Sequence, residues 1–212
     1  MFGNYCLFVC AATVIAAPAA LRQPFDTGRA EIGIGVLDHG IRRPFISPPP
    51  PGFDIYEGEE ERGSVDLNLV YRTAPVDFAL RPRLTARIQV NTAGGTNFAS
   101  LGAEWRQSVL RGRVYGQIGI GLAVHDGYRF TPDPAVPGLS RAEVLRRLEI
   151  EATRTSFGSR VLFNPNLSIG VRLSDRVAME AALEHFSHAT LFSAQNPGID
   201  NLGVRFVMTL GK

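Results

Sequence analysis

RLTARIQVN, residues 83–91, alternates apolar and polar side chains along its whole length. Successive side chains of a β-strand point to opposite faces, so a period of two predicts a strand with one apolar and one polar face. A tilted strand of about 9–11 residues crosses the hydrocarbon core of a bilayer, and this segment has that length. Its apolar face carries Leu84, Ala86, Ile88 and Val90.

The same alternation recurs in seven further segments of the chain. They are AEIGIGVLD, SVDLNLVYR, FASLGAEWR, VYGQIGIGLAVH, RVLFNPNLSIGVRL, RVAMEAALEHFSHA and DNLGVRFVMTL. Because an even number of strands of this length suits a closed barrel, the sequence predicts an all-β fold, an eight-stranded antiparallel transmembrane β-barrel.

The connections between these segments alternate between long and short. With the N-terminus on the periplasmic side, the short ones, near residues 73–81, 107–112 and 174–176, are periplasmic turns. We expect a short helix within the third long connection, in LSRAEVLRRLEIEAT. Long external loops with short periplasmic turns are typical of outer-membrane barrels. The predicted external loops are about 38–63, 91–97, 126–156 and 189–199.

The polar face of the segments carries nearly balanced charge, which predicts a filled interior of paired side chains instead of a pore. Alternation alone also fits a soluble lipocalin-like barrel, with the apolar set inside. Strand length, glycines on the charged face, loop asymmetry and an export signal favour the membrane version. The charged set is Glu31, Asp66, Glu104, Glu180 and Glu184 with Arg83, Arg87, Arg106, Arg160, Arg172 and Arg205.

The first 20 residues form an uncharged apolar run that ends in small residues. Ala17-Pro18-Ala19 offers a cleavage pattern, so residues 1–19 are predicted to be a signal peptide and residues 20–212 a single outer-membrane barrel domain. The alternative, a transmembrane helix, is disfavoured because the run is short. Both cysteines, Cys6 and Cys10, lie in this run, so the mature chain is expected to contain no disulfide and no cysteine-based site.

Charge and spacing argue against two other classes of protein. The formal charge is +2 and the arginines are scattered, with Lys212 the only lysine, so no nucleic-acid partner is expected. The spacing of His39, His125 and His188 matches no standard set of metal ligands. We therefore expect no metal and no cofactor.

One apolar stripe continues into polar residues near the C-terminus. In RVAMEAALEHFSHA, His185 and Ser187 lie on the same predicted face as the apolar set. The lipid-facing set of the next strand begins at Asp200, so the three side chains should share one external surface. A hydroxyl, an imidazole and a carboxylate are the parts of a nucleophile, base and orienting acid. Polar residues that meet lipid headgroups at a strand end are the alternative interpretation. The apolar set is Val177, Met179, Ala181 and Leu183.

Two motifs in this region, His185-Phe186-Ser187 and Asn196-Pro197-Gly198-Ile199-Asp200, resemble the C-terminal signature of the lipid A 3-O-deacylases of the PagL family. That family consists of eight-stranded outer-membrane barrels that hydrolyse the ester-linked acyl chain at position 3 of lipid A. The resemblance implies that Ser187 is the nucleophile, His185 the general base and Asp200 the orienting acid. Asn196 and the Gly198 backbone fall in the segment associated with oxyanion stabilisation.

The chain departs from the family pattern at two positions of this region. His188 stands where the family commonly has Asn, which bears on oxyanion support, and Asp200 stands where the acid is often Glu. The resemblance implies a carboxylic ester hydrolase of the bacterial outer membrane that acts on lipid A, or lipopolysaccharide, in the outer leaflet without a metal. It leaves a homodimer open. A non-catalytic outer-membrane barrel with a structural or surface-interaction role and, third, a secreted lipid-binding barrel are the alternatives.

Overall fold

Nine β-strands form a single hydrogen-bonded sheet within residues 28–41 and 60–211, the part of the chain that the computed structural model describes. The predicted signal peptide and most of the first external loop lie outside these residues. The strands are β1 (Glu31–His39), β2 (Ser64–Arg72), β3 (Arg83–Asn91), β4 (Phe98–Val109), β5 (Val114–His125), β6 (Val161–Phe163), β7 (Asn166–Arg172), β8 (Val177–Phe186) and β9 (Ile199–Thr209).

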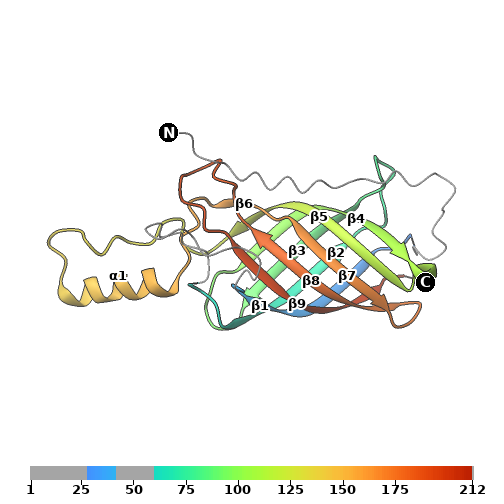
Figure 1. Ribbon diagram of the computed structural model, residues 1–212, viewed down its shortest axis with the longest axis horizontal. Coiled ribbons are helices and arrows are strands. Elements are labelled where there is room, and N and C mark those ends of the chain that lie inside the picture. The colour runs from blue at the N-terminus through green and yellow to red at the C-terminus, as the bar shows by residue number, and fades with distance from the viewer. Residues whose placement is uncertain (1–27, 42–59, 212) are drawn as a thin grey trace.

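The sheet closes on itself as an antiparallel barrel of eight strands (Figure 1). Strand β1 pairs with both β2 and β9, and β4 pairs with both β3 and β5. The register of β7 against β5 continues unchanged into β6. Between β6 and β7, Asn164 exchanges backbone hydrogen bonds of 2.8 and 3.0 Å with Gly121, while Pro165 has no N–H to donate. The two short pieces are therefore one barrel strand, and the predicted count of eight is confirmed.

The two faces of the barrel have opposite polarity, and the outer face is the apolar one. Ile34, Leu101 and Phe206 are 60%, 70% and 57% exposed, whereas Arg72 and Glu180 are fully buried inside. An apolar outer band around a polar interior is the arrangement that a lipid bilayer requires of a barrel. The soluble alternatives, which would place the apolar set inside, are wrong.

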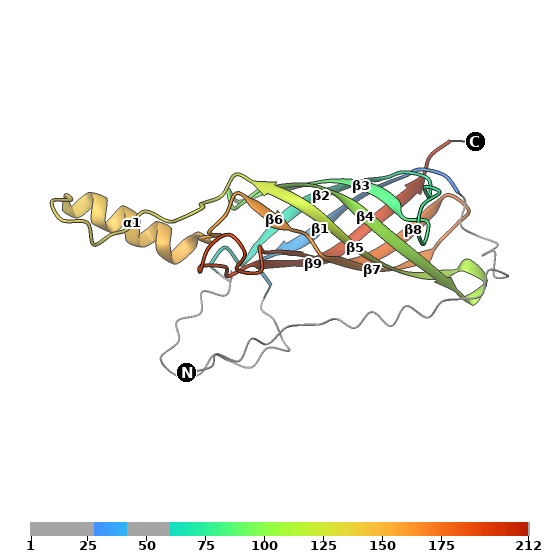
Figure 2. The same cartoon turned by 90° about the horizontal axis from the view of Figure 1, so that it is seen from above.

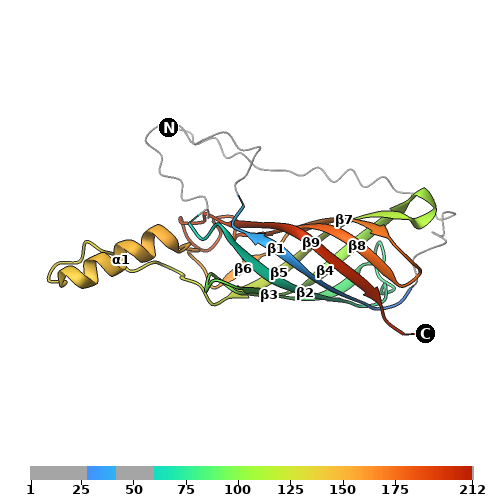
Figure 3. The same cartoon turned by 90° about the horizontal axis from the view of Figure 1, so that it is seen from below.

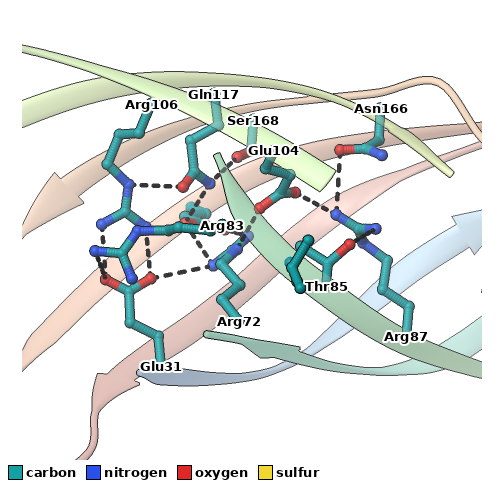
Figure 4. A network of polar contacts seen from close by, with 12 residues as sticks. Glu31, Arg72, Arg83, Thr85, Arg87, Glu104, Arg106, Gln117, Asn166 and Ser168 are labelled. Atoms are coloured by element: carbon teal, nitrogen blue, oxygen red, sulfur yellow. Dashed lines mark hydrogen bonds and ion pairs between the residues drawn. The ribbon is translucent and has the colours of Figure 1, made fainter. Parts of the chain in front are cut away.

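Paired charges fill the barrel interior, as Figure 4 shows for the network around Arg72. The Arg72 guanidinium donates to Glu104 at 2.5 Å and to Glu180 at 3.0 and 3.2 Å. Arg205 donates to Glu180 at 2.6 Å, and Arg106 donates to Glu31 at 2.5 and 2.6 Å. Buried charges are tolerated only when they are paired and hydrogen-bonded, so these contacts make the interior a solid plug.

Two arginines depart from the predicted interior set. Arg160 is exposed, because it precedes the first residue of β6 and the alternation of the strand does not extend to it; its guanidinium donates to the Gly127 carbonyl at 2.6 Å. Arg72 is absent from the predicted set and occupies the centre of the network. The remaining predicted members contribute charge to the inside of the barrel or to its rims.

The long connections gather at one end of the barrel and the short ones at the other (Figure 1). The longest described connection, residues 126–160, contains the expected helix, α1 (Arg141–Thr153), whose N-terminus is capped by the Ser140 hydroxyl. Figures 2 and 3 show that α1 extends beyond the strand ends, away from the C-terminus. At the short-loop end, the 3₁₀ turn η1 (Leu110–Gly112) joins β4 to β5. Among the described residues, no helix is both long and apolar enough to cross a membrane.

An apolar cluster seals the barrel mouth beneath the long loops. The Phe186 ring stacks on that of Phe98, with centroids 4.1 Å apart. The Phe157 ring meets Phe98 edge-on at 5.8 Å, which anchors the end of the 126–160 connection. This packing fixes the ends of β8 and β9. The cluster consists of Phe98, Ala123, Phe157, Leu162, Phe186 and Ile199.

A buried carboxylate, Glu61, ties the long loops to the mouth. It accepts hydrogen bonds from the backbone N–H groups of Thr96 (2.5 Å) and Thr155 (3.0 Å), and it contacts the Arg154 guanidinium (3.1 Å) and His39 (3.2 Å). Burial by itself raises the pKa of this carboxyl, but these hydrogen bonds and the Arg154 charge outweigh burial and lower the pKa to about 2. Glu61 therefore links three loops through one charge.

Candidate active site

The end of β8 presents two polar side chains on the lipid-facing surface. Phe186 and His188 point into the barrel mouth and are 1% and 0% exposed. Because side chains alternate along an extended chain, the intervening Ser187 and the preceding His185 point outward. Burial of the Phe186 ring in the apolar cluster thus fixes which way the polar pair faces.

Strand register brings Asp200 next to this pair. His185 lies directly opposite Asp200 in the β8–β9 ladder. The paired register ends at the next residue pair, where Phe186 lies opposite Ile199, and Gly198 directly precedes the start of β9. On its other side, Ser187 exchanges backbone hydrogen bonds of 2.7 and 3.2 Å with Phe163 of β6. The sheet therefore fixes the backbones of all three polar residues.

The three side chains form one hydrogen-bonded line. The Asp200 carboxylate lies 2.5 Å from His185 Nδ1, and the Ser187 Oγ lies 2.8 Å from His185 Nε2. A carboxylate at Nδ1 accepts a hydrogen bond, which assigns the ring proton to Nδ1 and leaves Nε2 as an acceptor for the Ser187 hydroxyl. This is the tautomer that a general base requires. His185 and Asp200 remain partly accessible, with side chains 28% and 12% exposed.

Contacts from the two residues that follow β1 hold the start of β9, and sequence reasoning did not identify them. The Ile41 N–H donates to the Asp200 carbonyl at 2.8 Å, and the Gly40 N–H donates to the Asn201 side-chain oxygen at 3.0 Å. Asn201 is fully buried, and its amide donates to Asp66 at 3.2 Å. Asn201 lies on the polar face of its segment, but no pattern in the sequence predicts its contact with the backbone that follows β1.

The residues predicted to support an oxyanion lie in the loop between β8 and β9. Asn196 accepts a hydrogen bond from the His188 backbone N–H at 2.8 Å, so its amide lies close to the backbone that follows Ser187. Within the described part of the chain, the Asn196 Nδ2 group makes no hydrogen bond. Gly198 is buried and has a φ of 66°, a left-handed conformation that favours glycine.

His188 has an internal role in the same loop. Its ring Nε2 donates to the Gln195 carbonyl at 2.9 Å, and its Nδ1 accepts from the Phe192 N–H at 3.4 Å. Both ring nitrogens are thus engaged, and the ring spans the loop from inside the mouth. The structure therefore separates the His188 ring from the outward face of Ser187 and joins it to the loop that carries Asn196.

The other two rim histidines have internal partners of their own. His39 lies between the carboxylates of Asp66 (2.8 Å) and Glu61 (3.2 Å), and His125 contacts the Ser159 carbonyl at 2.7 Å. Across residues 28–41 and 60–211, no three His, Cys, Asp or Glu side chains are grouped so as to hold a metal ion. The functional groups of the surface site are therefore a hydroxyl, an imidazole and a carboxylate, from Ser187, His185 and Asp200.

The fold and the site together define a class of protein: a membrane-spanning barrel with a hydrogen-bonded serine, histidine and aspartate at the end of β8 and the start of β9. A family model described as "Lipid A 3-O-deacylase (PagL)" matches residues 65–209. The chain belongs to this family, and the family resemblance seen in the sequence is confirmed. A search of the curated proteins found no match.

Solved structures similar to the chain include the following three. The crystal structure of the outer membrane enzyme PagL matches with a TM-score of 0.53 and 14% identity, over 85% of this chain and 99% of that one. A de novo designed transmembrane β-barrel matches with a TM-score of 0.47 and 9% identity, over 86% and 96%. The Yersinia pestis outer membrane protein Ail matches with a TM-score of 0.44 and 10% identity, over 86% and 99%. At these identities, the PagL structure supports the barrel fold alone.

Proposed function

We propose that this chain is an outer-membrane serine esterase that removes the 3-O-linked acyl chain of lipid A, with Ser187 as nucleophile, His185 as general base and Asp200 as orienting acid. The observation that carries the proposal is the pair of hydrogen bonds made by His185, 2.5 Å to Asp200 and 2.8 Å to Ser187. Membership of the lipid A 3-O-deacylase family supports the substrate and the reaction.

The hydrogen-bonded line supports acyl transfer in two steps. In the first, His185 Nε2 takes the proton of the Ser187 hydroxyl while Oγ attacks the ester carbonyl carbon. The tetrahedral intermediate collapses, the sugar alkoxide leaves, and the imidazolium protonates it. In the second, His185 takes a proton from water and the hydroxide attacks the carbonyl carbon of the acyl–Ser187 ester. The intermediate collapses, the C–Oγ bond breaks, the fatty acid leaves, and the imidazolium returns its proton to Ser187 Oγ. Asp200 stabilises the imidazolium in both steps.

The oxygen of the tetrahedral intermediate carries a negative charge, which hydrogen-bond donors beside the nucleophile must stabilise. Gly198 directly precedes Ile199, the partner of Phe186 in the β8–β9 ladder, and a buried glycine lets its backbone approach Ser187 without a side chain between them. The Asn196 amide reaches the same backbone through its bond to the His188 N–H. We assign the oxyanion donors to the Gly198 N–H and the Asn196 Nδ2 group, with His188 holding the loop that carries them.

The position of the site fits a substrate that stays in the membrane. The charged plug closes the barrel interior, and the polar line faces outward at the end of β8, beside the long loops. Ester groups of lipid A lie near its sugar headgroup, at the outer-leaflet surface. The substrate therefore reaches the nucleophile laterally from the leaflet, in agreement with an outer-membrane location and with the predicted signal peptide.

Mass spectrometry of lipid A tests the proposal. Cells that produce the full-length chain should contain lipid A that has lost one 3-hydroxyacyl group, whereas cells that produce Ser187→Ala should retain it. Ser108→Ala, at the opposite end of the barrel, is the matched control and should behave like the unaltered chain. Intact lipid A with the unaltered, membrane-inserted chain would favour the non-catalytic barrel.

A further inference from the structure

The 126–160 connection forms a polar pocket beyond the barrel mouth, outside the catalytic line. Both limbs of the connection contribute to its walls, and the loop between β8 and β9 adds one residue. Figures 1 and 2 show that the connection projects past the strand ends on the side where β8 ends and β9 begins. The pocket is lined by Thr131, Pro132, Asp133, Pro134, Glu151, Arg154, Ser156 and Gln195.

A short chain of contacts joins this pocket to the nucleophile. The Gln195 carbonyl accepts from the His188 ring at 2.9 Å, and His188 directly follows Ser187. Asn196, the next residue after Gln195, accepts from the His188 N–H at 2.8 Å. The same loop therefore borders the catalytic line on one side and the pocket on the other, which lets one substrate molecule reach both.

The two limbs of the connection hold the pocket in shape. The Phe157 N–H donates to the Tyr128 carbonyl at 3.0 Å, and the Gly158 N–H donates to the Arg129 carbonyl at 2.7 Å. The Phe157 ring is buried in the apolar cluster of the mouth. Because the walls are fixed before a ligand arrives, binding costs little ordering of the protein.

Carboxylates outnumber cations among the residues that line the pocket. Asp133 and Glu151 contribute two carboxylates, and the single cation, Arg154, already contacts the Glu61 carboxylate at 3.1 Å and the Gly94 carbonyl at 2.6 Å. A phosphate would meet more negative charge than positive charge here. Carboxylates, an amide and hydroxyls beside two proline rings suit a ligand with many hydroxyl groups and apolar C–H faces.

We propose that this pocket binds a neutral sugar of the carbohydrate that extends from lipid A above the membrane surface. The inference rests on the proposed function, because only a lipopolysaccharide substrate carries such sugars beside the scissile ester. The pocket then acts as a second recognition site, which favours lipopolysaccharide with attached core sugars over lipid A alone.

Binding of a sugar probe tests the pocket without reference to catalysis. The probe is the core oligosaccharide released from rough lipopolysaccharide, titrated calorimetrically into the full-length protein in detergent micelles. We expect Gln195→Ala and Thr131→Val to weaken binding about tenfold each, the loss of about one hydrogen bond to the sugar. Gln107→Ala, at the opposite end of the barrel, is the matched control and should bind like the unaltered chain. No binding by the unaltered chain, or equal binding by all variants, overturns the inference.

Kinetics separate this inference from the proposed function. Deacylation of rough lipopolysaccharide and of lipid A is measured with the same protein preparations. For each variant, kcat/KM for rough lipopolysaccharide is divided by kcat/KM for lipid A, and this ratio is compared with that of the unaltered chain. We expect this ratio to fall about tenfold in Gln195→Ala, in line with the loss of sugar binding. An unchanged ratio refutes the pocket while leaving the esterase intact. Absence of deacylation of both substrates by the unaltered chain refutes the esterase, and the oligosaccharide titration then still decides the pocket.

Discussion

Replacing Asp200 with Asn tests the mechanism most directly, since it keeps the shape of the side chain and removes its charge. In the unaltered site, the carboxylate accepts from His185 Nδ1 at 2.5 Å. Asn can instead donate to Nδ1, which favours the tautomer with the proton on Nε2. In that form Nε2 cannot accept the Ser187 proton, and the imidazolium loses its counter-charge.

The size of the effect follows from the geometry of the pair. Two unit charges about 4 Å apart attract by about 4 kcal/mol at an effective dielectric constant of about 20. Asp200 and His185 are only 12% and 28% exposed, so this intermediate dielectric constant suits them better than that of bulk water. Losing about 4 kcal/mol of transition-state stabilisation lowers kcat roughly 10³-fold.

The assay measures release of the 3-hydroxyacyl chain from purified lipid A in detergent micelles under substrate saturation. Asp200→Glu is the matched control, because it restores the charge and should retain much more activity than Asp200→Asn. Circular dichroism of each variant checks that the barrel has formed. Retention of more than about a tenth of kcat by Asp200→Asn would refute the role assigned to Asp200.

Three further predictions concern the barrel and its mouth. Arg72→Ala leaves buried carboxylates unpaired and should reduce the free energy of unfolding by about 3–5 kcal/mol, as measured by urea titration in detergent, whereas the exposed Arg113→Ala should change it little; equal effects would contradict the plug. Phe98→Ala removes the ring stacked on Phe186 and should cost about 3–5 kcal/mol in the same titration and lower kcat; unchanged kcat would show that the stack does not hold the site. Glu61 has a folded pKa near 2 against an ordinary value of 4.5, so its stabilisation is present above pH 4.5 and is lost as the pH falls towards 2. Melting temperatures across that window should fall more steeply for the unaltered chain than for Glu61→Gln, and parallel curves would contradict this role.

The sequence alone predicted the strands and their faces well, because the alternation of side chains along a strand is a local property. Each of the eight alternating segments lies in a barrel strand, and the set expected to face lipid is the exposed one. The same rule failed for Arg160, which lies just before β6, since alternation holds only where the backbone is extended and paired. Alternation also could not predict which arginine lies at the centre of the interior network, because this depends on how the strands are staggered around the barrel.

The site was partly predictable for the same reason. Alternation placed His185, Ser187 and Asp200 on one external face, and the family resemblance added their roles and the glycine loop. Neither predicted the residue-by-residue register that sets His185 opposite Asp200, nor the contact from Gly40, just after β1, that holds Asn201. The internal role of His188 could not be predicted from the sequence either, because its partners lie in a loop whose path the sequence does not specify.

The sequence by itself determined that this chain forms long strands with one apolar and one polar face, since period-two patterning fixes the face of each side chain within its own strand. The structure shows that the apolar face is the outer one. Only the tertiary structure decided which residues on different strands meet. Strand pairing sets the distance from His185 to Asp200, and the packing of Phe186 and His188 in the mouth turns Ser187 outward. Contacts between strands depend on register and loop closure, which are properties of the whole barrel and not of any one segment.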